Sequence, residues 1–337
     1  MDLHRHLEGS LRLQTMLDIA RKHTLTLPAP ATPAALSPLV QIQPDDPLTF
    51  ENFLSKFNSL RSFYRSPEVI GRITREAIED AALDNVRYLE LRFTPVALSR
   101  AERFPMSEVM DWVCENARES AKVYGINVRL IASVNRHESV ELAEQVARLS
   151  IERRSRGIVG FDLAGNEAQY PALPFAPLFK ETRQAGLKIT VHAGEWGGAE
   201  NIREAIETFS ADRIGHGVRI LEDENIISLA RAHATPFEVC LTSNYQSGAV
   251  RDLAGHPAAR MLAAGLNVSF NTDDPSVSRI SLGDEYRLAV EDLMIPLAVL
   301  KERILAGAWA AFLPDPEKKI LVTSLSSELD TAPGLQS

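Results

Sequence analysis

Eight short runs of β-branched and apolar residues recur along the 337-residue chain, with helix-like stretches between them. The runs fall at residues 1–6, 87–94, 127–134, 158–163, 188–192, 213–216, 236–240 and 267–271. The amphipathic stretches fall at residues 106–123, 138–154, 174–185, 199–209, 222–233 and 255–264. Alternation of strands and helices favours a parallel sheet. Eight such units in a chain of this length predict an α/β fold, a closed (β/α)8 TIM barrel.

The connection between the first and second predicted strands is much longer than the others. It spans residues 11–85 and includes a Pro- and Ala-rich stretch at 27–38. In such barrels the loops that follow the strands build the active site, so we expect this helical insertion to cover the pocket. Three helices are predicted within it, at residues 11–23, 48–60 and 67–84.

The chain continues well beyond the eighth predicted strand. Residues 280–312 predict two or three extra C-terminal helices. From about residue 322 the chain is rich in Ser, Leu and Pro, so we expect residues 323–337 to form a flexible tail. Because no internal repeat or linker divides the chain, residues 1–322 are predicted to form a single domain.

Composition excludes several classes of function. A net charge of −9 is a poor electrostatic match to a phosphate backbone, which argues against nucleic-acid binding. The only cysteines, Cys114 and Cys240, are far apart, so neither a disulfide framework nor a Cys-rich zinc site is expected. No apolar run approaches the roughly 18–20 residues of a membrane span, and the first residues contain no signal-peptide core. We therefore expect a cytoplasmic protein with no membrane partner.

Two histidines stand on the first predicted strand. His4 and His6 are two residues apart, which points both side chains to the same face of a strand. On a barrel strand that face can be the interior, where both imidazoles can bind one metal ion. The alternative is a pair of hydrogen-bonded histidines at a strand edge.

The fifth and sixth predicted strands also end in histidine. His192 is followed by Ala-Gly-Glu, and the small residues allow a sharp turn that returns Glu195 toward the pocket. The alternative is a strand-end turn that carries a solvated acid. His216 lies between two glycines, which allow close approach of the backbone. A tight turn explains these glycines equally well, but it does not explain the histidine.

The eighth predicted strand ends in two adjacent acids, Asp273 and Asp274. Adjacent acids at the end of a buried strand are costly unless a cation or a donor compensates their charge. The eighth strand of a closed barrel neighbours the first, which would bring Asp273 close to His4 and His6. The alternative is a helix N-cap before Pro275.

Each alternative is acceptable by itself, but together they do not explain why all four groups fall at C-terminal strand ends. Imidazole and carboxylate ligands suit a catalytic zinc ion that keeps one position open for water. The predicted ligands of this single ion are His4, His6, His192 and Asp273. A second zinc ion is not expected, because the fourth predicted strand has no lysine to bridge two metals. The remaining histidines are interpreted as surface or packing residues: His23, His137, His233 and His256.

A reaction follows from this arrangement. Zinc lowers the pKa of a bound water toward about 7, and His216 or the free oxygen of Asp273 would take its proton. Glu195 would act as a carboxylic acid if the closed pocket raises its pKa. Asp274 remains as a polar anchor for the substrate. The set suits attack on an sp2 carbon whose leaving group needs a proton.

Six motifs resemble those of the adenosine deaminase family, in the same order. They are Leu-His-Arg-His-Leu-Glu-Gly-Ser, Asp-Leu-Ala-Gly, Val-His-Ala-Gly-Glu, Arg-Ile-Gly-His-Gly, Leu-Thr-Ser-Asn and Asn-Thr-Asp-Asp-Pro. The resemblance runs from residue 2 to about residue 312. It implies a zinc-dependent enzyme that hydrolytically deaminates C6 of a 6-aminopurine, with adenosine and 2′-deoxyadenosine as substrates.

The resemblance also implies roles for the matched residues. Glu195 would protonate ring N1, and His216 would position or deprotonate the attacking water. Asp274 would hydrogen-bond ring N7, and the backbone N–H of Gly165 would meet ring N3. The implied substrate-binding residues, which include an apolar wall from the insertion, are His6, Glu8, Gly165, Asp274, Phe50, Phe53 and Leu54.

Two positions depart from the family pattern. Many adenosine deaminases carry Asp where this chain has Glu8, and that acid contacts the ribose 5′-hydroxyl. Asn166 stands where Asp is more usual. Deamination of a 5′-modified adenosine such as aminofutalosine therefore remains an alternative, and free adenine a weaker one. Two other classes stay open: a cyclic amidohydrolase and a non-catalytic purine-binding protein.

Overall fold

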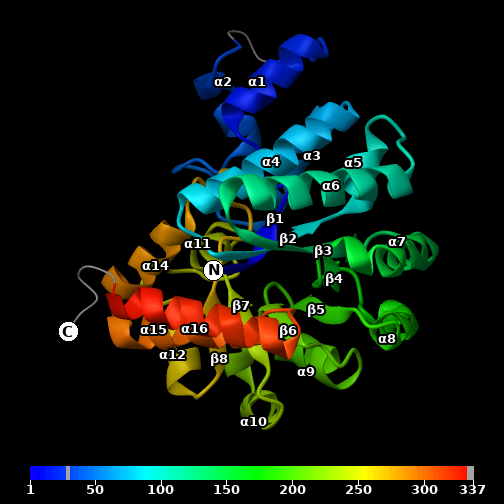
Figure 1. The fold of residues 1–337 in the computed structure, drawn as a ribbon. Helices are drawn as coiled ribbons and strands as arrows, with labels where there is room; N and C mark the ends of the chain where they lie inside the picture. The colour runs from blue at the N-terminus through cyan, green and yellow to red at the C-terminus, as the bar shows by residue number, and fades with distance from the viewer. Residues whose placement is uncertain (28–30, 332–337) are drawn as a thin grey trace.

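The eight strands of the protein form one closed parallel sheet, and the computed structural model describes residues 1–27 and 31–331 (Figure 1). The strands are β1 (Asp2–His6), β2 (Tyr88–Phe93), β3 (Asn127–Asn135), β4 (Ile158–Ala164), β5 (Lys188–Ala193), β6 (Arg213–His216), β7 (Pro236–Val239) and β8 (Asn267–Phe270). They are hydrogen-bonded in sequence order. A parallel bridge from Arg5 to Asp273 joins β1 to the segment after β8 and closes the sheet. The predicted (β/α)8 barrel is confirmed.

Helices surround the barrel, and six of them match the predicted ranges to within three residues. Those between β2 and β8 are α5 (Pro95–Arg100), α6 (Met106–Tyr124), α7 (Val140–Glu152), α8 (Ala176–Gln184), α9 (Ala199–Glu207), α10 (Glu224–Ala232), α11 (Leu241–Gln246) and α12 (Ala258–Ala263). Short 3-10 helices are η1 (Arg61–Phe63), η2 (Arg154–Arg156), η3 (Leu173–Phe175) and η4 (Ile220–Glu222). Within the described ranges, no helix combines the length and apolar character needed to cross a membrane.

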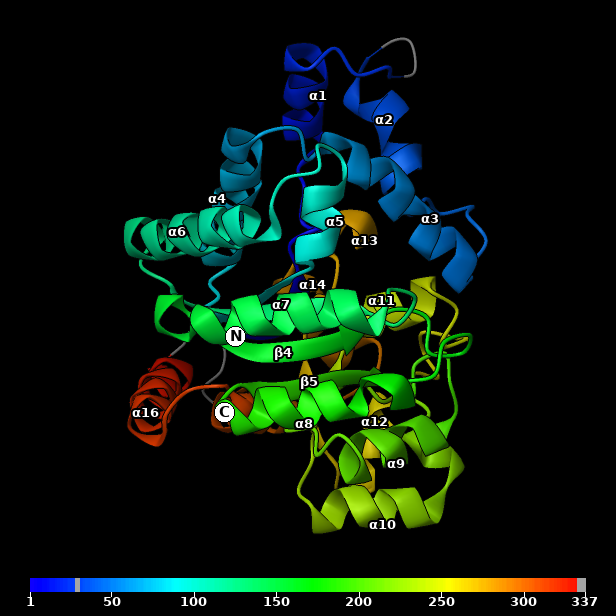
Figure 2. The same cartoon turned by 90° about the vertical axis from the view of Figure 1, so that its right-hand side faces the viewer.

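The connection between β1 and β2 is helical throughout most of its length. Its helices are α1 (Leu13–Lys22), α2 (Pro33–Val40), α3 (Phe50–Leu60) and α4 (Pro67–Leu83), and α1 to α3 stand beyond the strands in Figure 2. The Pro-rich pattern did not predict α2. Pro33 occupies its first turn, where no N–H is needed, and the Thr32 side chain accepts a hydrogen bond from the N–H of Ala35.

The C-terminal region forms α13 (Pro275–Ser278), α14 (Leu282–Glu291), α15 (Leu297–Ala310) and α16 (Asp315–Thr331). The prediction of a flexible tail is wrong for residues 323–331, which are helical. Leu321 and Leu325 of α16 are buried in a small core with Met1 and Leu3. This apolar packing explains why a segment with many polar residues forms an ordered helix. Residues 332–337 of the predicted tail lie outside the described residues.

The strands are buried on both faces, but they do not carry apolar residues only. In β2, Leu89, Leu91 and Phe93 join the core between sheet and helices. The alternating residues Glu90 and Arg92 are fully buried on the opposite face, toward the barrel interior. Charged groups therefore lie directly beneath the ends of the strands, where they can contact the residues of a site.

Candidate active site

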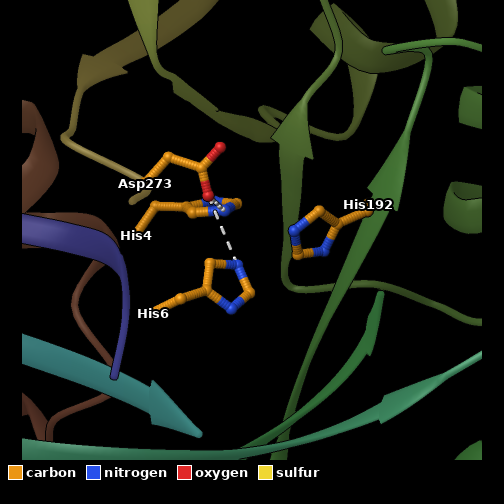
Figure 3. A group of neighbouring side chains, drawn as sticks. All are labelled: His4, His6, His192 and Asp273. Carbon is orange, nitrogen blue, oxygen red and sulfur yellow. Dashed lines mark ion pairs between the residues drawn. The ribbon is translucent and has the colours of Figure 1, made fainter. Parts of the chain in front are cut away.

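Four side chains from three parts of the barrel converge at the C-terminal ends of the strands. His4 and His6 extend from β1, His192 extends from β5, and Asp273 follows β8 (Figure 3). One nitrogen or oxygen atom from each lies within 4.8 Å of the others. Asp273 Oδ1 is 3.3 Å from His4 Nε2 and 3.4 Å from His6 Nε2. His4 Nε2 is buried and has no hydrogen-bond partner. This donor set and this unpaired nitrogen fit a metal ion of the zinc type.

The other ring nitrogens of two of these histidines are held by buried carboxylates. His4 Nδ1 is 2.8 Å from Glu238 Oε2, and His192 Nδ1 is 3.0 Å from Asp162 Oδ1. Both carboxylates are fully buried. A carboxylate acceptor at Nδ1 places the proton there and leaves Nε2 free to bind a metal. Glu238 and Asp162 therefore orient His4 and His192.

One buried guanidinium connects the two carboxylates. Arg92 Nη2 donates to Glu238 Oε2 at 2.7 Å, and Arg92 Nη1 lies 3.6 Å from Asp162 Oδ2. Burial would raise the pKa of Glu238, but Arg92 and Arg213 hold it well below its usual range. Burial likewise opposes ionisation of Asp162, yet His192 and Arg92 lower its pKa. Both carboxylates are therefore ionised where the histidines need them.

Sequence reasoning missed this group, although a signal was present. Arg92 and Glu238 are charged residues inside runs that were predicted to be buried strands. Charged side chains are almost never fully buried unless they are paired. A charge inside a buried strand therefore indicates a partner, but only the folded chain identifies it.

Glu195 and His216 face each other beside the four convergent side chains. His216 Nε2 is 3.5 Å from Glu195 Oε2 and 4.0 Å from Asp273 Oδ2. Asn244 Nδ2 lies 3.0 Å from His216 Nδ1. Burial, assisted by the charges of Asp273 and Glu167, raises the pKa of Glu195 well above its usual value. Burial lowers the pKa of His216 well below its usual value. The pair therefore combines a carboxylic acid with a neutral imidazole.

The turn that carries Glu195 is held by a second acid. Glu167 accepts the backbone N–H of Gly194, Glu195 and Trp196 at 2.9, 2.5 and 2.8 Å. Gly194 has a φ of +70°, and a Cβ there would lie 2.4 Å from Ile202 Cδ1. Glycine is required at this position, so the Ala-Gly-Glu sequence serves the turn as predicted.

Two of the site residues have strained backbones. His216 and Asp273 have φ values of +61° and +62°, in the left-handed region that side chains with a Cβ rarely adopt. Such residues cluster at functional sites because the surrounding structure must hold them in place. Ser243 Oγ donates to Asp273 Oδ2 at 2.6 Å and so fixes one oxygen of this carboxylate.

Asp274 occupies the N-cap position of α13, but its side chain makes no capping hydrogen bond. The capping alternative therefore does not explain this residue. Asp274 Oδ1 is buried and has no partner. Burial and the charges of Asp273 and Glu8 raise its pKa well above the usual value. The side chain is available to a ligand in the pocket.

A pocket of about 540 Å³ opens above these groups, a volume within the range of small-molecule sites. Every predicted site residue lines it except His4, which is fully buried. The predicted residues in the lining are His6, Glu8, Phe50, Phe53, Leu54, Gly165, His192, Glu195, His216, Asp273 and Asp274. The structure thus brings together segments that are up to about 270 residues apart.

Several lining residues were not predicted, among them Arg61, Asn135, His137 and Trp196. His137 was interpreted as a surface or packing residue; it is exposed, as that interpretation implies, but it also lines the pocket. Its position just after β3 is a C-terminal strand end, which could have identified it. By contrast, His256 is buried as a packing residue outside the pocket lining.

The class of protein follows from three features together: the barrel, the convergent ligand set and the acid–imidazole pair. They define a metal-dependent hydrolase that acts on a carbon–nitrogen bond. A model of the family "Adenosine deaminase" matches residues 1–328, and the chain belongs to this family of hydrolases acting on C–N bonds in cyclic amidines. An adenosine deaminase from Serratia proteamaculans is 38% identical over 320 residues, which cover 95% of this chain and 96% of that protein.

Two solved structures are similar over nearly the whole chain. An adenine deaminase from Arthrobacter aurescens has a TM-score of 0.90 and 27% identity, with 98% of each chain covered. Arabidopsis ADAL, complexed with IMP, has a TM-score of 0.85 and 28% identity, with 97% of this chain and 96% of that chain covered. These two solved structures thus share the fold with this chain, while their descriptions mention different purine compounds, adenine and IMP.

Proposed function

We propose that this enzyme deaminates adenosine and 2′-deoxyadenosine at C6, producing inosine or 2′-deoxyinosine and ammonia. The observation that carries the proposal is the convergence of His4, His6, His192 and Asp273 beside Glu195 and His216. This places possible metal ligands, an acid and an imidazole around one point of a purine-sized pocket. The 38% identical Serratia relative is named an adenosine deaminase, which agrees with this substrate class.

One zinc ion is the cofactor that we propose. His4, His6, His192 and Asp273 would hold it, since imidazole and carboxylate ligands with an open position are typical of catalytic zinc. When bound, zinc supplies a water of lowered pKa that can attack near neutral pH. We propose a single ion because β4 carries no lysine that could bridge two metals.

The protein's own residues carry the proton transfers. His216 accepts the proton of the attacking water, whose oxygen bonds to C6. Glu195 donates a proton to ring N1, which makes C6 electrophilic before attack. His216 then returns its proton to the C6 amino group, so the C6–N bond breaks and ammonia leaves, while the proton of the new C6 hydroxyl passes to Glu195. The raised pKa of Glu195 and the lowered pKa of His216 put both groups in the protonation states that these steps need.

Other pocket residues orient the purine. Asp274 Oδ1, which is buried without a partner, would bond ring N7. The N–H of Gly165, whose φ of +92° favours glycine, would meet ring N3. Phe50, Phe53 and Leu54 of α3 would form the apolar wall over the ring. Glu8 Oε2, also without a partner, would bond the ribose 5′-hydroxyl.

The test is ammonia release by the zinc-loaded protein from adenosine, 2′-deoxyadenosine, adenine, 5′-methylthioadenosine and aminofutalosine. We expect adenosine and 2′-deoxyadenosine to have the highest kcat/KM. A lead by a 5′-modified compound would assign Glu8 to a different 5′ group. A lead by adenine would remove the proposed role of Glu8 altogether. No activity on any of these compounds, with zinc bound, would overturn the proposal.

A further inference from the structure

The short helix α11 contacts both a proposed metal ligand and the proposed proton acceptor. Ser243 Oγ donates to Asp273 Oδ2 at 2.6 Å, and Asn244 Nδ2 lies 3.0 Å from His216 Nδ1. Ser243 and Asn244 are fully buried. Their positions therefore depend on where the backbone of α11 lies in the protein interior.

The same helix also reaches the proposed acid. Ser247, the C-cap residue of α11, is buried, and its Oγ donates to Glu195 Oε1 at 3.3 Å. In the part of the chain that the structure describes, none of residues 241–247 lines the pocket proposed for the purine. The helix thus contacts three groups of the proposed chemistry without contacting the proposed substrate site.

The N-terminal end of α11 is not held by its own N-cap residue. Cys240 occupies that position and makes no side-chain capping hydrogen bond. A thiol is a weak acceptor, whereas the first N–H groups of a buried helix end need acceptors. Because Leu241 is fully buried, its N–H needs an acceptor from elsewhere in the chain.

Glu285 of α14, which lies beside α11 (Figure 1), supplies this acceptor. Its side chain is fully buried. The N–H of Leu241 donates to Glu285 Oε2 at 2.6 Å, and the N–H of Thr242 donates to Oε1 at 3.1 Å. The hydroxyl of Thr242 donates to the same Oε1. A residue 44 positions further along the chain therefore caps the helix that holds the site.

We propose that Glu285 is a positioning residue for deamination, because its cap on α11 holds the polar side chains of that helix against the metal ligand, the base and the acid. This inference rests on the proposed function. Glu285 does not line the pocket, so its loss should slow the chemical step while purine binding stays nearly intact. A purely structural role predicts a less stable protein whose folded molecules work at the normal rate.

The experiment compares Glu285→Gln with the control Glu76→Gln in the zinc-loaded enzyme, at a temperature where both are folded. Glutamine has one acceptor oxygen instead of two, so an amide donor would oppose one of the donors of α11. Glu76 of α4 is also a buried acceptor, for Thr15 Oγ1 at 2.6 Å and Arg72 Nε at 2.8 Å, but it does not line the pocket. The measured quantities are kcat for adenosine, the inhibition constant of inosine and zinc affinity by competition with a chelator.

We expect Glu285→Gln to lower kcat by about 10–100-fold, the usual effect of losing support for residues at a metal site, and to weaken inosine by less than about threefold. Zinc affinity should fall as well, because Ser243 would hold Asp273 less well. Thr242→Val removes only the hydroxyl donor and should give a smaller change in the same direction. Glu76→Gln should lower the melting temperature and leave the three quantities unchanged.

A double-mutant cycle tests whether Glu285 acts through α11. Ser243→Ala removes the hydrogen bond to Asp273 and should by itself lower zinc affinity. If Glu285 places that hydroxyl, the double variant loses less zinc affinity than the two single losses combined. Independent losses would overturn the proposed route through α11.

A kcat for folded Glu285→Gln within about threefold of the unmodified enzyme would contradict the positioning role. A loss of inosine binding as large as the loss of kcat would also contradict it, because it would indicate general distortion of the pocket. If Glu285→Gln does not fold, Thr242→Val provides the same comparison. If the unmodified enzyme releases no ammonia from adenosine, the proposed function fails, and the zinc affinities of the cycle then test Glu285 separately.

Discussion

Burial, and not residue type alone, makes Glu195 a proton donor and His216 a proton acceptor. A carboxyl group that is buried beside another acid keeps its proton, and a buried imidazole stays neutral. His216 Nε2 and Glu195 Oε2 are 3.5 Å apart. Both groups can therefore reach neighbouring atoms of the same bound substrate. Substitutions at this scale should therefore separate proton transfer from binding.

The first prediction concerns Glu195→Gln. Gln keeps the shape and can still accept from Ser247 Oγ, which lies 3.3 Å from Glu195 Oε1, but it cannot transfer a proton. We expect kcat for adenosine to fall by about 10²–10⁴-fold, while zinc content and the inhibition constant of inosine change little. Glu200→Gln, an exposed acid in α9, is the control. Activity near that of the control would contradict the acid role.

The second prediction separates the two adjacent acids. Asp273→Ala removes a proposed ligand and should lose zinc, measured as metal content after gel filtration. Asp274→Ala keeps the ligand set, so zinc should remain while KM for adenosine rises, because alanine offers no donor to ring N7. Full zinc occupancy in Asp273→Ala would refute its assignment as a ligand.

The third prediction concerns acid stability and a residue far from the chemistry. Burial and the charge of Arg260 lower the pKa of His256 from 6.5 to about 3. Below pH 6.5 the unfolded chain therefore binds a proton that the folded chain does not, and stability falls as pH falls toward 3. A shift of 3 to 4 units corresponds to about 4–5 kcal/mol over this range.

His256→Asn tests this sign directly. Asn offers an acceptor for the N–H of Ala258, which His256 Nδ1 now accepts at 3.1 Å, but it does not titrate. The free energy of unfolding, measured by denaturant titration of the metal-free protein, should decline less between pH 6.5 and pH 4 in the variant. Parallel curves for the two proteins would show that His256 is not protonated on unfolding.

At the scale of elements, the strands act as a rigid frame that holds the site by buried charges. β1 supplies His4, β7 supplies Glu238, and β2 supplies Arg92, so one ligand depends on three strands. Arg213 of β6 also contacts Glu238 and lies over the ring of Phe312, 3.4 Å from its centroid. The network thus continues from the metal ligands to the segment that follows α15.

The fourth prediction is that Arg92 positions the metal site without touching substrate. Arg92→Met leaves Glu238 and Asp162 buried with less compensation, so both would tend to bind protons and orient His4 and His192 less well. We expect zinc affinity, measured by competition with a chelator, to fall by about 10–100-fold, the usual effect of losing such support. KM for adenosine should change less than zinc affinity.

A matched pair of variants controls this experiment. Arg92→Lys retains a positive charge and should recover part of the zinc affinity. Arg129→Met removes a partly exposed ion pair with Glu317 and should leave affinity unchanged. If Arg92→Met is merely less stable and binds zinc normally at low temperature, the positioning role is wrong.

For the whole molecule, closure of the barrel brings the first and last parts of the chain together. The Arg5–Asp273 bridge aligns the ligands of β1 with the acid after β8. Beneath the strands, α15 and α16 pack on Met1, Leu3 and the start of β2. The C-terminal half of β1 therefore carries residues of the proposed metal site, and its N-terminal end packs in the small core below the barrel.

The fifth prediction tests the packing of α16. Leu325 is buried against this small core, so Leu325→Ala should lower the free energy of unfolding by about 2–4 kcal/mol through lost burial and a cavity. Ile320→Ala, on the same helix, is the control because Ile320 is 70% exposed. Equal stability of the two variants would mean that α16 adds little to the fold.

The sequence by itself determined the strand and helix pattern, the ends of the strands and the residues that could bind metal. These features are local, since they depend on side-chain periodicity and on short motifs such as Val-His-Ala-Gly-Glu. The same locality explains its errors: the Pro-rich stretch around α2 looks like a loop although proline is acceptable in a first helical turn, and α16 is ordered by distant apolar partners.

Tertiary structure alone decided which charges meet. No local pattern pairs His4 with Glu238 or His192 with Asp162, because partners on different strands are set by barrel closure and register. The same holds for Arg61, whose guanidinium reaches the pocket only when the insertion folds over the strand ends. Electrostatic interactions depend on distance in space and on burial, and neither can be read from spacing along the chain.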